Sequence, residues 1–132
     1  MKKLFTFCFF ILSTSVFSDE SYVYIIEPKD GSQVVNPIRV VFGLSGMGVA
    51  PAGVDKPGTG HHHLLIDLTQ LPDLTKPIPT DKNHLHFGGG QTETILNLEP
   101  GNHDLQLILG NWFHVPHSNP LISKKITIEV KE

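Results

Sequence analysis

Histidine is the residue type whose number and spacing most directly predict chemistry in this sequence. The chain has eight histidines among 132 residues, and seven of them fall in three short clusters, at residues 61–63, 84–86 and 114–117. Neutral imidazole is a common protein ligand for zinc and copper, and it is abundant at pH 7. The histidines therefore predict a binding site for Cu(II) or Zn(II).

The spacing within the clusters distinguishes candidate ligands from structural histidines. In an extended segment, two histidines separated by one residue place both rings on the same side of the strand. The third cluster lies in a loop that contains Pro116, where a turn could bring its two histidines together. The predicted metal ligands are therefore His61, His63, His84, His86, His114 and His117. His62 alternates toward the core face and His103 stands alone near a strand start, so both are predicted to be structural.

Four further residues could support a metal site, namely Met47, Asp67, Gln91 and Glu93. Met47 is a possible soft ligand for Cu(I), although a methionine in a glycine-rich loop commonly fills a gap in the core. Asp67 shares a strand face with His61 and His63 and could orient a ligand histidine through a hydrogen bond. Glu93 could act as a base beside a metal, or it could be a solvated strand carboxylate.

Residues 1–18 have the features of a secretory signal peptide. Lys2 and Lys3 precede an apolar run at residues 4–12, which is too short to span a bilayer, and small residues precede Asp19. Cleavage is expected near Ser18-Asp19, which predicts a periplasmic or secreted protein. No later segment is apolar enough to cross a membrane.

The mature chain, residues 19–132, is predicted to form a single domain. It has eight basic and 13 acidic side chains, so a basic nucleic-acid-binding surface is excluded as its main feature. The single cysteine, Cys8, leaves with the signal peptide. A metal site in the mature chain must therefore use histidine, methionine or carboxylate, because no thiolate remains.

The pattern of turns and alternation predicts an all-β fold. Helical periodicity is absent, and turn residues recur at short intervals. Strands are expected at residues 22–27, 33–44, 61–68, 91–98, 103–109 and 125–130. The connection at residues 69–83 contains three prolines, which disfavour regular structure. About seven short strands in a domain of this size indicate an immunoglobulin-like β-sandwich, with a small closed β-barrel as the alternative.

Three long motifs carry a resemblance to a known family. Phe-Gly-Leu-Ser-Gly-Met-Gly-Val-Ala-Pro-Ala-Gly at residues 42–53, Gly-Thr-Gly-His-His-His-Leu-Leu-Ile-Asp at 58–67 and His-Leu-His-Phe-Gly-Gly-Gly-Gln-Thr-Glu at 84–93 resemble small exported bacterial proteins. That family is catalogued as domain of unknown function 4399, and it implies no established activity. Residues 100–130 are also loosely similar to periplasmic copper-binding sandwiches of the copper-resistance C type, which implies a shared architecture only.

These observations lead to three hypotheses of different classes. The first is a periplasmic histidine-rich protein that buffers, stores or delivers Cu(II) or Zn(II), with the metal ion and a periplasmic protein as partners. The second is a metal-independent module in which the histidines, Gln91 and Glu93 bind a ligand or a protein. The third is a metalloenzyme with Glu93 or Asp81 as the acid-base group, and no catalytic residue is assigned for it.

Overall fold

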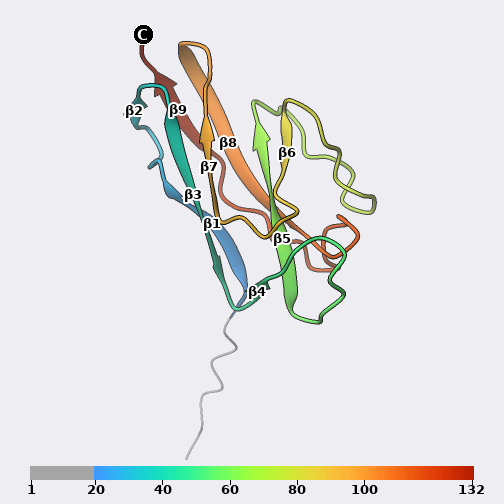
Figure 1. The fold of residues 1–132 in the computed structure, drawn as a ribbon. Coiled ribbons are helices and arrows are strands. Elements are labelled where there is room, and N and C mark those ends of the chain that lie inside the picture. The colour runs from blue at the N-terminus through green and yellow to red at the C-terminus, as the bar shows by residue number, and fades with distance from the viewer. Residues whose placement is uncertain (1–19) are drawn as a thin grey trace, which may run out of the picture.

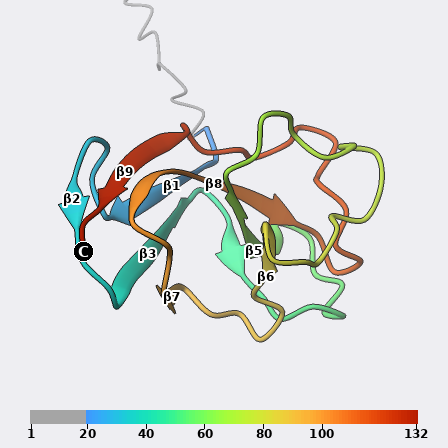
Figure 2. The same ribbon diagram turned by 90° about the horizontal axis from the view of Figure 1, so that it is seen from above.

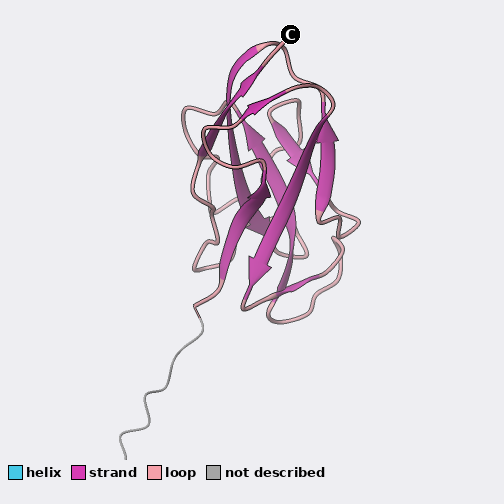
Figure 3. Cartoon of the chain, turned by 90° about the vertical axis from the view of Figure 1, so that its left-hand side faces the viewer, coloured by secondary structure: helices cyan, strands magenta, loops and turns pink. Residues whose placement is uncertain are grey.

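The computed structural model describes residues 20–132, so the predicted signal peptide lies outside the described residues. This part of the chain forms nine strands and no helix (Figure 3). The strands are β1 (Tyr22–Glu27), β2 (Gln33–Val34), β3 (Ile38–Ser45), β4 (Gly48–Val49), β5 (Thr59–Ile66), β6 (His84–His86), β7 (Glu93–Leu96), β8 (Gly101–Gly110) and β9 (Ile126–Val130). Residues 20–132 therefore contain no helix of the length and apolar character needed to span a membrane.

The strands form two open sheets that face each other (Figure 1). One sheet has the order β1-β3-β7, and the other has the order β2-β9-β8-β5-β4. Strand β6 also pairs with β5, so β4 and β6 contact β5 at different points along its length. Neither sheet closes on itself, and the prediction of a β-sandwich rather than a closed barrel is confirmed.

The main core lies between the two sheets and is built from alternating residues. In β3 the inward positions Ile38, Val40 and Phe42 are buried, and the intervening Arg39 is exposed. Leu64 of β5 and Leu107 of β8 are directly opposite each other on adjacent strands of the second sheet, and neither is exposed to solvent. Burying each such side chain contributes about 1.5–3 kcal/mol, so this layer holds the sandwich together and fixes the position of β5.

Two features of the strand order differ from the prediction. The segment at residues 33–44, in which one strand was expected, contains two strands in different sheets, because the chain turns at Asn36 and Pro37. Pro37 has no N–H for a ladder hydrogen bond, and the Asn36 side chain instead bonds the backbone of Leu98 in both directions. The second difference is that β4 and β6 are short strands within segments that were not expected to pair.

A second, smaller apolar cluster lies on the outer face of β5 and β8. It consists of Leu65, Ile78 and Ile108, all of which are buried. The connection between β5 and β6 and the loop after β8 run over this side of the molecule (Figure 2). They meet where the backbone N–H of Ile78 donates to the carbonyl of His114, at 2.9 Å. The face of β5 that was expected to point away from the core is therefore covered as well.

Candidate metal centre

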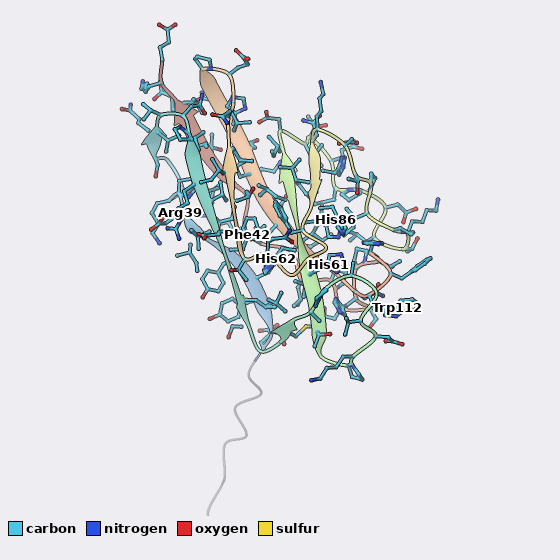
Figure 4. All side chains as sticks on the ribbon, in the orientation of Figure 1. Arg39, Phe42, His61, His62, His86 and Trp112 are labelled. Carbon is cyan, nitrogen blue, oxygen red and sulfur yellow. The ribbon has the colours of Figure 1, made fainter. Side chains whose placement is uncertain are left out.

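Strand β5 presents three consecutive histidines to two different environments. His62 lies on the side of Phe42, and His61 lies on the opposite side with His86 (Figure 4). The alternation matches the prediction, but none of His61, His62 and His63 is exposed to solvent. The ring nitrogens of a fully buried histidine need hydrogen-bond partners or another favourable interaction, because burying a polar group without one costs free energy.

Two other segments bring histidines to the rings of His61 and His63. His86 is directly opposite His63 in the antiparallel pair of β5 and β6. His114 comes from the loop after β8, which folds back so that Gly110 forms a bridge with Pro116. The ring centroids of His86 and His114 are 4.7 Å apart, and each lies 5.1 Å from the ring of His61. Three segments distant in sequence thus converge on one place.

We call the residues His61, His63, His86 and His114 the four-histidine cluster. Each offers one ring nitrogen, and these four atoms lie within 4.8 Å of one another. The Nε2 atom of His61 is 3.1 Å from Nε2 of His63 and 3.1 Å from Nδ1 of His114. A tetrahedral ion with metal–nitrogen bonds of about 2.0–2.1 Å separates its ligand nitrogens by about 3.3 Å. The cluster could therefore hold a metal ion with little rearrangement.

Two glycines, which have no side chain, leave room for the imidazole rings of the cluster. A Cβ atom added to Gly110 would lie 2.9 Å from Nε2 of His63, and one added to Gly88 would lie 2.6 Å from Nε2 of His86. Gly88 belongs to the glycine run that follows β6, and Gly110 is the last residue of β8, opposite His61. Both positions therefore require a residue without a side chain so that the imidazoles can approach one another.

The loop that carries His114 is held in an unusual backbone conformation. His114 has a φ of 64°, in the left-handed region that residues other than glycine rarely adopt. Its N–H donates to the carbonyl of Asn111, while Oδ1 of Asn111 accepts hydrogen bonds from the N–H groups of Phe113 and Val115, at 2.9 and 3.0 Å. Asn111 thus fixes the turn that points His114 into the cluster.

Replacing Asn111 is expected to weaken both folding and metal binding. Asn111→Ala removes the shared acceptor, which should lower the free energy of unfolding by about 1–3 kcal/mol and metal affinity by about 10–100-fold. Asn111→Asp keeps an acceptor oxygen and should retain most of the affinity. Chemical denaturation and competitive metal titration of the two variants test this expectation, and equal affinity in Asn111→Ala and the unmodified protein would contradict it.

Burial and the neighbouring imidazoles keep His61, His63 and His86 uncharged at neutral pH. Burial is the main cause that lowers the pKa of His61 to about 4, and the nearby His86 and His114 lower it further. Burial likewise lowers the pKa of His63 to about 3, with His61 and His86 as the next causes. The pKa of His86 is also lowered, by burial and then by His114. These imidazoles can bind a metal without losing a proton first.

The other two predicted ligands lie outside the cluster. Nδ1 of His84 is 2.8 Å from Oδ1 of Asp81, so this histidine closes the turn that leads into β6. Nε2 of His117 donates to the carbonyl of Thr59 at 3.0 Å and ties the loop after β8 to the start of β5. The structure therefore brings together four of the six predicted ligands, and it gives these two histidines other contacts.

The four residues predicted to assist the site also have other contacts. Met47 packs against the main core. Gln91 accepts a hydrogen bond from the N–H of Gly89 through its side-chain oxygen. Glu93 is exposed and pairs with Arg39. Arg39 lies on the outer side of the other sheet (Figure 4). Asp67 bonds His103, as described below, so none of the four belongs to the cluster.

His62 and His103 occupy contrasting structural positions. His62 is packed against Phe42 with ring centroids 5.2 Å apart, and its nitrogens make no well-formed hydrogen bond within residues 20–132. Burial lowers its pKa to about 4, and the backbone of Gln91 opposes part of that shift. His103 places Nδ1 2.7 Å from Oδ2 of Asp67 and Nε2 2.8 Å from the carbonyl of Glu99. Both of these partners are acceptors, so both ring nitrogens of His103 carry protons when both bonds form.

The stabilising effect of His103 is expected to disappear at high pH. Burial is the largest single cause and opposes the charged form, but the hydrogen bonds to Asp67 and to the carbonyl of Glu99, together with the nearby negative charges, outweigh it and raise the pKa of His103 above its usual 6.5. The contribution is therefore fully present below about pH 6.5 and is lost as the pH rises through the folded-state pKa. His103→Gln should lower the free energy of unfolding by about 1–2 kcal/mol at pH 6 and by clearly less at pH 9. Denaturant titrations at both pH values test this, and a loss that grows with pH would contradict it.

The fold and the cluster together define the class of protein. It is an all-β sandwich protein with four buried or half-buried histidines gathered on the outer face of one sheet. The chain belongs to the family described as domain of unknown function (DUF4399), whose model matches residues 40–131. No curated protein and no solved structure matches the chain significantly. The looser similarity to copper-resistance sandwiches stays a prediction.

Proposed function

We propose that this protein is an exported binding protein for a transition-metal ion, copper or zinc, which it buffers, stores or delivers. The observation that carries the proposal is the convergence of four imidazole nitrogens within 4.8 Å in a place where two of the rings are fully buried. Packing alone does not account for this arrangement, because buried imidazoles that face one another leave polar atoms without partners.

The hydrogen-bond inventory supports the proposal. Nε2 of His61 faces two other imidazole nitrogens, and a single ring nitrogen has either one proton or one lone pair. Nε2 of His86 is buried and has no partner among the described residues. A metal ion at the centre would bind all of these lone pairs at once. The binding site for that ion consists of His61, His63, His86 and His114.

Metal titration of the mature protein tests the proposal directly. Isothermal titration calorimetry should give one site for Cu(II) or Zn(II) with a dissociation constant well below about 100 μM. The variant with His61→Ala and His63→Ala should lose that site. His84→Ala is the matched control, because His84 lies next to the cluster in sequence and bonds Asp81 instead.

Two outcomes would replace this function with another. Dissociation constants weaker than about 100 μM for both metals, unchanged by the double substitution, would exclude a site for Cu(II) or Zn(II) in the cluster. Ligand or protein binding that survives exhaustive chelation would favour the metal-independent module. The metalloenzyme hypothesis has less support, because Asp81 bonds His84 and Glu93 pairs with Arg39, so neither carboxylate is free to act beside the cluster.

A further inference from the structure

The four-histidine cluster has no charge with which to neutralise a bound ion. All four candidate donors are imidazoles, and the group contains no carboxylate or thiolate from the described residues. Most zinc sites combine histidine with cysteine or carboxylate, and those ligands cancel part of the charge of the ion. An ion in this cluster would keep its full charge of +2 for Zn(II) or Cu(II), or +1 for Cu(I).

The surroundings of the cluster supply no compensating charge either. The titratable groups that act on His61, His63 and His86 are other histidines, and no acidic side chain is among them. The three acids named as candidates from the sequence are engaged elsewhere, since Asp81 bonds His84, Asp67 bonds His103, and Glu93 pairs with Arg39. An ion bound here would therefore meet neutral dipoles rather than a negative side chain.

The cluster also lies in an apolar and largely buried place. His61 and His63 have no exposed surface, and the side chain of Ile108 lies directly opposite His63 on the same face of the sheet. The second apolar cluster, with Leu65 and Ile78, lies on this face too. The cost of moving an ion from water into such an environment grows with the square of its charge, so it is about four times larger for a divalent than for a monovalent ion of equal size.

We propose that the four-histidine cluster selects a monovalent copper-group ion, Cu(I), over Zn(II). This inference rests on the proposed function, since it names the ion for the same site. Neutral imidazoles suit copper in either oxidation state, and a site without anionic ligands disfavours the ion of higher charge. Because Cu(I) and Zn(II) both accept tetrahedral coordination, the charge of the ion is the property that separates them here.

The experiment compares affinities for Cu(I), Ag(I) and Zn(II) in the mature protein. Competition with chromophoric chelators, without oxygen and with ascorbate for Cu(I), gives each dissociation constant at pH 7. The affinity of the protein for each ion, which is the reciprocal of the dissociation constant, is divided by the affinity of free imidazole for the same ion in the same buffer. This division removes the intrinsic preference of imidazole for one ion over another. The normalised affinities for Cu(I) and for redox-inert Ag(I) are expected to exceed that for Zn(II) by at least about 100-fold, a difference of about 2.7 kcal/mol.

A charge-altering variant provides the matched test. His86 is partly exposed, so a carboxylate can be introduced at its position in His86→Glu, with the neutral His86→Gln as control. His86→Glu should shift the preference toward Zn(II) relative to His86→Gln. A normalised preference for Zn(II) in the unmodified protein, or no difference between the two variants, would overturn the inference while leaving metal binding intact. Failure of all three ions to bind would instead overturn the proposed function and this inference with it.

Discussion

Lowering the pH from 7 to about 4.5 is expected to unfold the metal-free protein. His62 and His63 are neutral in the folded state because burial lowers their pKa values to about 4 and about 3. In the unfolded chain both titrate near 6.5. Below about pH 6.5 the unfolded state therefore binds more protons than the folded state, so stability falls as the pH falls. The loss continues until the pH reaches the folded-state values.

The size of this effect is comparable with the whole stability of a domain. Each histidine that must be protonated on unfolding contributes a slope of about 1.4 kcal/mol per pH unit, so two contribute about 3 kcal/mol per unit. Small domains are stable by about 5–15 kcal/mol. Two pH units below 6.5 therefore remove a large part of the stability, before most carboxylates are protonated.

Circular dichroism in the presence of a chelator measures this transition. His62→Leu replaces an imidazole without hydrogen bonds by an apolar side chain next to Phe42, and it should move the midpoint to lower pH. His103→Gln serves as the control of opposite sign, because the raised pKa of His103 makes its contribution largest in acid. A free energy of unfolding that stays constant between pH 7 and 5 would contradict the expectation.

Strand alternation was sufficient to pair His61 with His63 and to separate them from His62. It also predicted the strands that carry the core, because the core positions of β3, β8 and β9 repeat with a period of two, but it left a closed barrel as an alternative to the sandwich. The alternation could not show that the outer face of β5 is covered. That cover comes from a proline-rich connection and from the loop after β8, and neither has a periodic pattern.

The remaining members of the cluster depend on register and loop geometry. His84 and His86 are two residues apart, as His61 and His63 are. The register of β6 nevertheless places only His86 opposite His63, while His84 bonds Asp81 in the turn before β6. His114 reaches the cluster through a left-handed backbone that Asn111 stabilises, which no spacing rule predicts. Gly88 and Gly110 mark the cluster only once the structure is known, because each lies against a cluster histidine.

A variant that lacks two cluster histidines is expected to be at least as stable as the unmodified protein without metal, and less stable than the unmodified protein when metal is present. Nδ1 of His61 and Nδ1 of His63 are buried without hydrogen-bond partners in the described part of the chain, so the metal-free fold carries the cost of both. Leucine has nearly the volume of histidine and no polar atoms. The variant with His61→Leu and His63→Leu should therefore be as stable as the unmodified metal-free protein, or more stable by about 1–3 kcal/mol.

Adding metal should change that order, because only the unmodified protein can bind it. An ion at 100 times its dissociation constant stabilises the folded state by about 2.7 kcal/mol, which raises the melting temperature by roughly 10 °C in a domain of this size. Thermal unfolding with chelator and with metal gives four melting temperatures, and His84→Leu serves as a control that should keep the metal-dependent rise. If the double variant melts several degrees below the unmodified protein in chelator, the buried Nδ1 atoms of His61 and His63 do not destabilise the metal-free fold as proposed. If both proteins gain equally from metal, the ion binds somewhere other than the cluster.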